Sequence, residues 1–332
     1  MDYLYRFTLR VKKILQDIQI PMKIIERIED IDKPFTNAVV TIGNFDGVHI
    51  GHQSLFHEVV QKANHLRGTS LAMTFDPHPL RVLTNRRHPP LITLNEQKKE
   101  LIAATELDVL IVVPFTQEFA AISARDFITE LLVKRIGMKA IIVGQDYSFG
   151  KNREGDIHLL QELGRQEEFE VILADWIKSS HQNKDRISST RIRELVAAGD
   201  IEKAQKLLGR HYQIRGTVIA GRNRGGKLLG FPTANLALHD ELCPKTGIYA
   251  VTVDWEGGNH HGVANIGYSP TFDDHLFTVE VHILDFDQDL YGKQIKINFL
   301  KRIRDEIKFD SIEALSRQIR NDIAVARDLL ND

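Results

Sequence analysis

Two histidines follow a glycine turn near the start of the chain, in the segment GNFDGVHIGH at residues 43–52. His49 and His52 are three residues apart, so in a helix or a tight turn both rings lie on one face and can donate hydrogen bonds to one oxyanion. The apolar run at residues 38–42 is typical of a buried parallel strand, and residues 53–67 are expected to form a helix that begins at the turn. Unpaired amides at a helix N-terminus attract phosphate. The segment therefore predicts a site for a nucleoside triphosphate that needs no covalent nucleophile.

Two other interpretations of this segment follow from its residue types alone. Glycine-aspartate turns are common, and histidines at this spacing are often surface residues or half of a metal site. The strand and the glycine turn before the histidines make a nucleotide site the more specific interpretation. A zinc site is less favoured, because no third ligand stands nearby at metal spacing and the single cysteine, Cys243, lies far along the chain.

The first half of the chain alternates short apolar runs with longer helical patterns. This alternation predicts an α/β domain with a doubly wound, Rossmann-like parallel sheet. The expected strands are residues 38–42, 70–75, 109–113, 140–143 and 170–174. In such sheets the ligand lies beyond the carboxyl ends of the strands. Those ends lead into GNFDGVHIGH, into FDPHP at residues 75–79 and into GQDYSFG at residues 144–150, so we expect these segments to converge.

The second half of the chain changes to strands separated by turns. The expected strands are residues 212–219, 247–254, 260–265, 278–284 and 294–300, with a helix at residues 311–330. Their spacing predicts a small antiparallel β-barrel closed by a helix. The glycine-rich, basic segment GRNRGGKLLGFPTAN at residues 221–235 suits an anion but is a weak signal by itself. On strand alternation Glu280 and His282 share one face, so the carboxylate can point into a barrel mouth.

Composition and charge limit the class of protein. A length of 332 residues suggests two domains, and 42% hydrophobic residues leave enough material for two cores. The formal net charge of −2 argues against a general nucleic-acid-binding surface. One cysteine allows no internal disulfide and suits a reducing compartment. There is no apolar run of transmembrane length and no signal-peptide core, so we expect a cytoplasmic protein without a membrane partner.

Several motifs taken together resemble one family. GNFDGVHIGH, TFDPHP, VGQDYSFG and ISSTRIR stand in the order found in the adenylyltransferase half of bacterial bifunctional riboflavin kinase/FAD synthetases, which are HxGH-type nucleotidyltransferases. GFPTAN at residues 230–235, the strand around Glu280 and the segment 301–311 resemble the riboflavin kinase half. The resemblance implies two reactions: ATP-dependent phosphorylation of riboflavin to FMN, and adenylyl transfer from a second ATP to FMN, giving FAD and pyrophosphate.

The resemblance also implies roles for individual residues. In catalysis it implies Glu280 as the base of the kinase, with His49, His52 and Arg193 stabilising the adenylyl transition state, where a guanidinium accommodates charge on departing pyrophosphate. The residues implied in nucleotide binding are Gly43, Asn44, Phe45, Asp46, Gly47, Ser188, Ser189, Thr190, Gly221, Gly230 and Pro232. Those implied in flavin binding are Asp76, Pro77, His78, Asp146, Phe149, Arg302 and Arg304. Thr233 and Asn235 are implied as oxygen ligands of Mg²⁺, with ATP as co-substrate and FMN and FAD as product ligands.

The same resemblance divides the chain. It implies a possible N-terminal extension at residues 1–21, an FMN adenylyltransferase domain at residues 22–198 and a riboflavin kinase domain at residues 199–332. One departure from the family pattern is Ser269, where many relatives carry arginine before Pro-Thr-Phe. We expect this change to affect contacts of the loop and not the reaction. From the residues alone, hydroxyls at the start of the helix near residue 188 are an ordinary N-cap.

Two rival functions stay open at this point. An adenylyltransferase that uses another phosphorylated acceptor would carry the same histidine motif. The second rival is a binding module in which the glycine-rich, basic segment contacts RNA or protein. Near-neutral charge and the lack of an aromatic-basic strand signature weigh against that module. We therefore expect small-molecule partners, namely riboflavin, FMN and ATP, and no nucleic acid.

Overall fold

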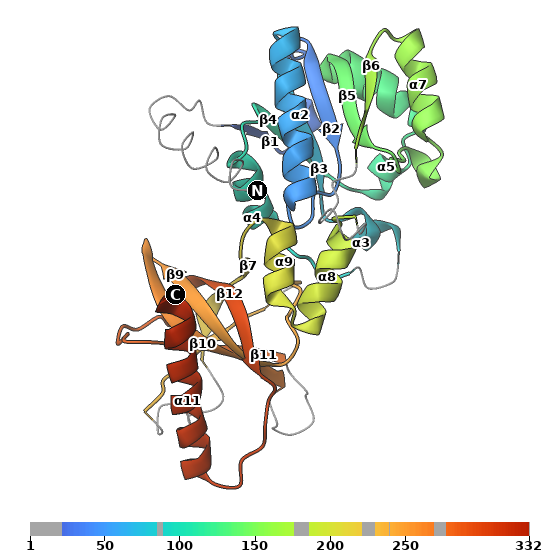
Figure 1. The fold of residues 1–332 in the computed structure, drawn as a ribbon. Coiled ribbons are helices and arrows are strands. Elements are labelled where there is room, and N and C mark those ends of the chain that lie inside the picture. The colour runs from blue at the N-terminus through green and yellow to red at the C-terminus, as the bar shows by residue number, and fades with distance from the viewer. Residues whose placement is uncertain are drawn as a thin grey trace. The chain divides into compact units, whose positions relative to one another are not determined.

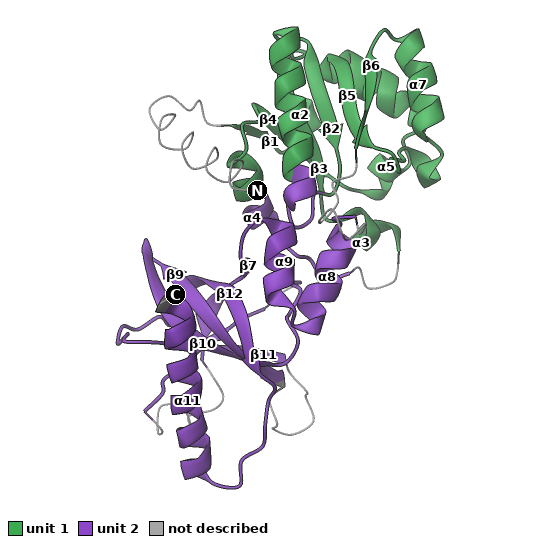
Figure 2. Cartoon of the chain, in the orientation of Figure 1, with its two compact units in different colours: residues 1–44, 53–88, 99–175 green, residues 45–52, 89–98, 176–332 purple. Residues whose placement is uncertain are grey.

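A computed structural model describes residues 22–84, 89–175, 186–220, 230–238, 240–268 and 277–331 (Figure 1). The chain forms two compact units, which are coloured separately in Figure 2. Unit 1 comprises residues 1–44, 53–88 and 99–175, and unit 2 comprises residues 45–52, 89–98 and 176–332. The segment that carries His49 and His52 therefore groups with the C-terminal part of the chain. The extension expected at residues 1–21 lies outside the described residues.

Unit 1 contains a six-stranded parallel sheet in the order β1-β4-β3-β2-β5-β6. Its strands are β1 Lys23–Ile25, β2 Ala38–Ile42, β3 Ser70–Asp76, β4 Val109–Pro114, β5 Met138–Gly144 and β6 Glu170–Ala174. The five predicted strands and the doubly wound fold are confirmed, and β1 adds a short edge strand. From β2 the chain adds β3 and β4 on one side and β5 and β6 on the other, so the topological switch point lies between β2 and β5. Segments predicted to bind ligand follow both of these strands.

The inner strands β2 to β5 are largely buried because helices cover the sheet, whereas the edge strands β1 and β6 are partly exposed. The helices are α2 Ile50–Leu66, α3 Pro79–Leu83, α4 Asn95–Ala103, α5 Gln117–Ala120, α6 Ala124–Asp126, the π-helix η2 Phe127–Ile136 and α7 Ile157–Gln166, with the 3₁₀ turns η1 Ile28–Asp30 and η3 Lys151–Arg153. All five residues of β2 are buried, as expected for a central parallel strand. Helix α2 begins at Ile50, three residues earlier than the predicted position 53. The helix thus begins directly after His49, and His52 lies in its first turn.

Unit 2 contains a closed antiparallel barrel in the order β10-β11-β8-β7-β12-β9. Its strands are β7 Tyr212–Ile219, β8 Ala234–Leu236, β9 Gly247–Trp255, β10 Gly258–Tyr268, β11 Phe277–Ile283 and β12 Gln294–Arg304. The predicted barrel is confirmed, but the sequence pattern missed β8. This strand has three residues, too few for an alternating pattern, and it is defined by pairing with β7 and β11.

Helices complete unit 2 at both ends of its sequence. Helices α8 Ser189–Ala198 and α9 Ile201–Leu208 precede the barrel and share a hydrophobic core with it. The last helix, α11 Ile312–Asn331, lies against β9 and β10. Arg304 of β12 holds this helix through two hydrogen bonds of 2.8 and 2.6 Å to the buried carboxylate of Asp322.

Candidate active sites

The turn after β2 has a strained backbone. Phe45 and Val48 have positive φ angles of 47° and 39°, and Gly47 lies between them with φ 85°. Left-handed conformations are costly for bulky and β-branched residues and persist only where surrounding contacts hold them. All three residues are also buried. The contacts that hold this turn therefore decide where the histidines after it are placed.

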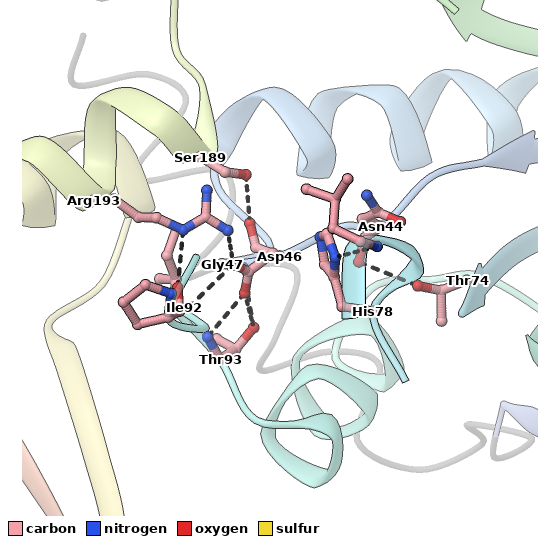
Figure 3. Close-up of polar contacts among 11 residues, drawn as sticks. Asn44, Asp46, Gly47, Thr74, His78, Ile92, Thr93, Ser189 and Arg193 are labelled. Carbon is pink, nitrogen blue, oxygen red and sulfur yellow. Dashed lines mark hydrogen bonds and ion pairs between the residues drawn. The ribbon is translucent and has the colours of Figure 1, made fainter. Parts of the chain in front are cut away.

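Asp46 anchors the turn through its buried side chain. Its carboxylate accepts hydrogen bonds from the backbone N–H groups of Ile92 (3.1 Å) and Thr93 (3.0 Å), and from the Thr93 hydroxyl (3.2 Å). Arg193 donates to the same carboxylate at 2.5 Å and to the carbonyl of Pro90 at 2.9 Å. Figure 3 shows these groups gathered around Asp46. A side chain predicted to contact nucleotide thus serves, in this structure, to fix the turn and to orient Arg193.

The backbone of the turn is held by the side chains of Thr93, Ser189 and Arg210. The Thr93 hydroxyl accepts from Gly47 N–H at 3.0 Å, and the Ser189 hydroxyl donates to the Asp46 carbonyl at 2.8 Å (Figure 3). Arg210 donates to the carbonyl of Gly47 at 2.6 Å. Thr93 and Arg210 were not recognised from the sequence. They lie 46 and 163 residues from Gly47, and no local pattern links them to the turn.

The two histidines stack face to face at the start of α2. Their ring centroids are 3.6 Å apart with an interplanar angle of 17°. The backbone N–H of His52 donates to Nδ1 of His49 at 3.3 Å. Burial, together with the charges of Arg186 and Arg210, lowers the pKa of His49 to about 4. His49 is therefore neutral at pH 7, and because its Nδ1 accepts a hydrogen bond, its proton sits on Nε2.

The ring of His52 is also neutral and has a buried nitrogen that can hydrogen-bond to a ligand. Burial lowers its pKa well below the usual histidine value, with His49 and nearby cations adding to the effect. Its Nδ1 is buried and has no hydrogen-bond partner among the described residues. Gly51 allows the stacking, because a Cβ at this position would lie 3.1 Å from the ring of His49. The pair can thus offer neutral N–H donors to a phosphate oxygen.

These histidine pKa values predict a loss of stability in acid. The unfolded chain has histidine pKa values near 6.5 and so binds the proton more tightly than folded His49. The stability contribution is present above about pH 6.5 and is lost as the pH falls toward about 4, at a cost of about 3 kcal/mol. Thermal melting between about pH 8 and about pH 5 should show a smaller loss for His49→Asn than for the wild type. Parallel curves for the two proteins would contradict this prediction.

The other predicted residues of the Ser188 segment have separate positions. Ser188 is the N-cap of α8 and accepts from the backbone N–H of Arg191 at 3.2 Å, so the cap interpretation holds for this residue. Thr190 is exposed. Arg191 forms an ion pair with Glu194 at 2.9 Å on the surface of α8. Ser189 and Arg193 are the two members of the segment that contact Asp46.

The residues predicted to bind flavin in unit 1 lie after β3 and β5. Asp76 is exposed at the end of β3, and the Asp76–Pro77 peptide bond is cis. His78 caps α3, its Nδ1 accepting from the backbone N–H of Leu80 at 3.2 Å. Asp146 is exposed in the turn after β5. Phe149 lies in the core of unit 1, and its flavin role stays a prediction, as do those of Asp76, Pro77, His78 and Asp146.

The start of the nucleotide motif is also fixed within unit 1. The Thr74 hydroxyl donates to the carbonyl of Asn44 at 3.2 Å, and Gly43 N–H donates to the carbonyl of Met73 at 3.1 Å. Both bonds join the end of β2 to the neighbouring strand β3. The exposed side chain of Asn44 is thereby carried on a rigid sheet edge.

Three polar residues lie at one level across neighbouring strands of the barrel. Glu280 of β11 pairs with Asn265 of β10 on one side and with Asn235 of β8 on the other. Directly paired residues project from the same face of an antiparallel sheet. Val279 and Val281 lie in the barrel core, so Glu280 projects from the opposite face, outward from the core. Burial raises the pKa of Glu280, which strengthens its carboxylate as a base.

The segment that carries the predicted metal ligands runs beside this carboxylate. His282, on the same face as Glu280, contacts the carbonyl of Pro232 through Nδ1 at 2.8 Å. A carbonyl can only accept, so this contact places the His282 proton on Nδ1. The ring of Phe231 meets the ring of His282 edge-on, with centroids 5.7 Å apart. These contacts fix the chain directly before Thr233, whose side chain is exposed.

Parts of the predicted kinase site fall outside the described residues. Gly221, the basic segment up to residue 229 and the loop with Ser269 are among them. Gly230 has φ 82°, a conformation that favours glycine. Arg302 donates to the carbonyl of Thr246 at 2.6 Å and to Asp305 at 2.5 Å, and Arg304 is engaged by Asp322. Both arginines thus have structural partners, and their flavin role stays a prediction.

Comparison with known proteins matches both halves of the chain. The FAD synthetase family matches residues 31–191, and the riboflavin kinase family matches residues 208–330. A bifunctional riboflavin kinase/FMN adenylyltransferase of Buchnera aphidicola is 38% identical over 93% of this chain and 99% of its own length. The relative of the same description from Escherichia coli is 37% identical over 92% and 97%. The chain belongs to the bifunctional riboflavin kinase/FMN adenylyltransferase family. Another member of this family, from Listeria monocytogenes, is 40% identical over 86% of this chain and 90% of its own length.

A solved structure also resembles this member of the family. It is described as a macrolide-efflux protein from Streptococcus pneumoniae, is 33% identical and has a TM-score of 0.81. The match covers 93% of this chain and 99% of that chain. In the part of the bifunctional enzyme that the structure describes, no helix is both long enough and apolar enough to cross a bilayer.

Proposed function

We propose that the two reactions of this family, phosphorylation of riboflavin to FMN and adenylyl transfer from ATP to FMN, take place at two separate groups of residues in this chain. Family membership supports both reactions. It also favours a flavin acceptor over the other phosphorylated acceptors that the histidine motif allows. The observation that carries the assignment of residues is the alignment of Glu280 with Asn235 on adjacent strands, beside the segment of Thr233.

In the kinase reaction, Glu280 accepts the proton of riboflavin's terminal ribityl hydroxyl as that oxygen attacks the γ-phosphate of ATP. Its raised pKa supports this role, because a base is most effective when its pKa approaches the working pH. Thr233 and Asn235 offer the hard oxygen atoms that Mg²⁺ prefers. Asn235 pairs directly with Glu280 across β8 and β11, and Thr233 lies two residues before Asn235. A bound Mg²⁺ would neutralise charge on the ATP phosphates. The products are FMN and ADP.

In the adenylyl-transfer reaction, a phosphate oxygen of FMN attacks the α-phosphate of ATP, and pyrophosphate leaves. The N–H groups of His49 and His52 stabilise the charge that develops on the phosphate oxygens. Arg193 donates a hydrogen bond to the leaving pyrophosphate and stabilises its negative charge. Its Nε and one terminal nitrogen hold Pro90 and Asp46, and its Nη1 makes no hydrogen bond within the described residues. The neutral state of His49 supports this role, because its Nε2 then carries a proton to donate.

The Mg²⁺ assignment is tested by titrating the metal. We expect Asn235→Ala to raise the Mg²⁺ concentration for half-maximal FMN formation by about tenfold or more, because one oxygen ligand is lost. FAD formation from supplied FMN should keep its Mg²⁺ dependence in the same variant. Asn259→Ala, on the exposed end of β10, is the matched control. A normal Mg²⁺ dependence of the kinase in Asn235→Ala would contradict the assignment.

The limits of the two domains remain part of this proposal. We assign residues 22–198 to adenylyl transfer and residues 199–332 to the kinase. The matched ranges 31–191 and 208–330 support a division near this point. We further propose that the enzyme acts in the cytoplasm on small molecules, which its single cysteine and near-neutral charge support.

A further inference from the structure

Arg210 lies between α9 and β7, and its hydrogen bonds to the described residues all go to backbone carbonyls. Its guanidinium contacts the carbonyl of Gly47 at 2.6 Å, that of Val48 at 3.3 Å and that of Leu208 at 3.4 Å. Two of these carbonyls belong to the strained turn before His49. A planar guanidinium can hold two neighbouring acceptors in one fixed geometry, which the single ammonium of lysine cannot do.

The environment of Arg210 is unfavourable for a cation. Burial, together with the charge of Arg215, lowers its pKa to about 10, and the carboxylate of Asp46 offsets only part of this effect. Its Nε is buried and lacks a hydrogen-bond partner, and it forms no ion pair within the described residues. A buried cation without a paired anion destabilises a fold. The site that the turn leads into is the one proposed to receive a triphosphate, and a triphosphate is an anion.

The charge of Arg210 also acts on both histidines of the motif. It contributes to the lowered pKa of His49 and of His52. By sequence, however, Arg210 lies within the range matched by the riboflavin kinase family, which begins at residue 208. The FAD synthetase family match ends at residue 191. A residue of the kinase half therefore holds the nucleotide motif of the adenylyltransferase half.

We propose that Arg210 is a positioning residue for adenylyl transfer: it holds the carbonyls of Gly47 and Val48 and thereby sets where His49 and His52 present their N–H groups. Its positive charge adds to the attraction of this turn for the ATP phosphates. The inference rests on the proposed role of the two histidines. It makes FAD formation dependent on a contact supplied by the segment that leads into the kinase barrel.

Two substitutions in the full-length enzyme separate geometry from charge. Arg210→Met keeps the volume but removes both charge and donors, and should lower kcat/KM for ATP in FAD formation from FMN by about 10²-fold or more. Arg210→Lys keeps the positive charge but loses the planar guanidinium that holds two carbonyls at once. We expect it to restore the KM for ATP and to leave kcat at least about tenfold below the wild type.

FMN formation from riboflavin by the same samples reports the state of the fold. It should stay at the wild-type rate in both variants, and in the control Arg320→Met on the exposed face of α11. Should Arg210→Met fail to fold, Arg210→Lys alone decides the question through its kcat.

Two results would overturn the inference. One is an unchanged kcat for FAD formation in Arg210→Lys, which would show that the guanidinium geometry is not needed to position the histidines. The other is an equal fall of both reactions, which would make Arg210 a residue of general stability. Assaying His49→Ala in parallel keeps the two proposals apart. FAD formation retained by His49→Ala refutes the site itself, whereas its loss alongside normal Arg210 variants refutes the role of Arg210 alone.

Discussion

Replacing Glu280 by glutamine is expected to abolish FMN formation while leaving FAD formation from supplied FMN unchanged. Glutamine has nearly the shape of glutamate but cannot accept the proton of the attacking hydroxyl. The loss of a positioned general base lowers a rate by about 10²- to 10⁴-fold. The pairing of β11 with β8 and β10 should persist, because it depends on the backbone. The measurement is the initial rate of each reaction in separate assays with ATP and Mg²⁺.

Two features make this experiment decisive for the base. FAD formation from FMN in the same sample shows that the protein is folded and binds ATP. Glu313→Gln, at the exposed start of α11, controls for the change of charge and should behave as the wild type. If the kinase turns over normally in Glu280→Gln, another group accepts the proton and the assignment is wrong.

Replacing His49 by alanine is expected to have the opposite effect, stopping FAD formation and leaving FMN formation intact. The change removes the Nε2–H donor that the neutral ring holds ready, and it removes the stacking partner of His52. Loss of one donor to a transition-state oxyanion costs about 10²- to 10³-fold in kcat. The loss should appear mainly in kcat for FMN adenylylation, because the donor acts on charge that develops during the reaction.

The control for His49→Ala comes from the same helix. His57 is exposed on α2, and its Nε2 lies 2.7 Å from the side-chain nitrogen of Gln61, so His57→Ala should keep both activities. A fall of FMN formation in a folded His49→Ala protein would show that the two reactions are not independent. Normal FAD formation in that variant would instead remove His49 from the reaction.

The sequence predicted the parts of this enzyme that are encoded locally. Five strands of the sheet and five strands of the barrel were recognisable because each is long enough to show its periodicity, whereas the three-residue strand β1 was not. The histidine pair was recognisable because spacing alone places both rings on one face. The motif segments after β2 and β5 could be assigned to one sheet edge because parallel strands present their carboxyl ends together.

The contacts that fix the turn between β2 and His49 could not be predicted in this way. Thr93 and Arg210 act on Gly47 across 46 and 163 residues of chain, and neither stands in a recognisable motif. The carboxylate of Asp46 accepts hydrogen bonds from Thr93, Ile92 and Arg193, partners that no sequence pattern indicated, and its predicted contact with nucleotide stays a prediction. Tertiary pairing likewise defines β8, which has too few residues for a pattern. Long-range polar contacts of this kind become visible only when the fold is known.

The central claim is that one chain carries both reactions in sequence. It is tested most directly by a chromatographic time course of the purified enzyme with riboflavin, ATP and Mg²⁺, resolving riboflavin, FMN and FAD. The account predicts that FMN appears first and that FAD follows at its expense. FMN that accumulates without FAD, or a failure to convert even supplied FMN, would contradict it.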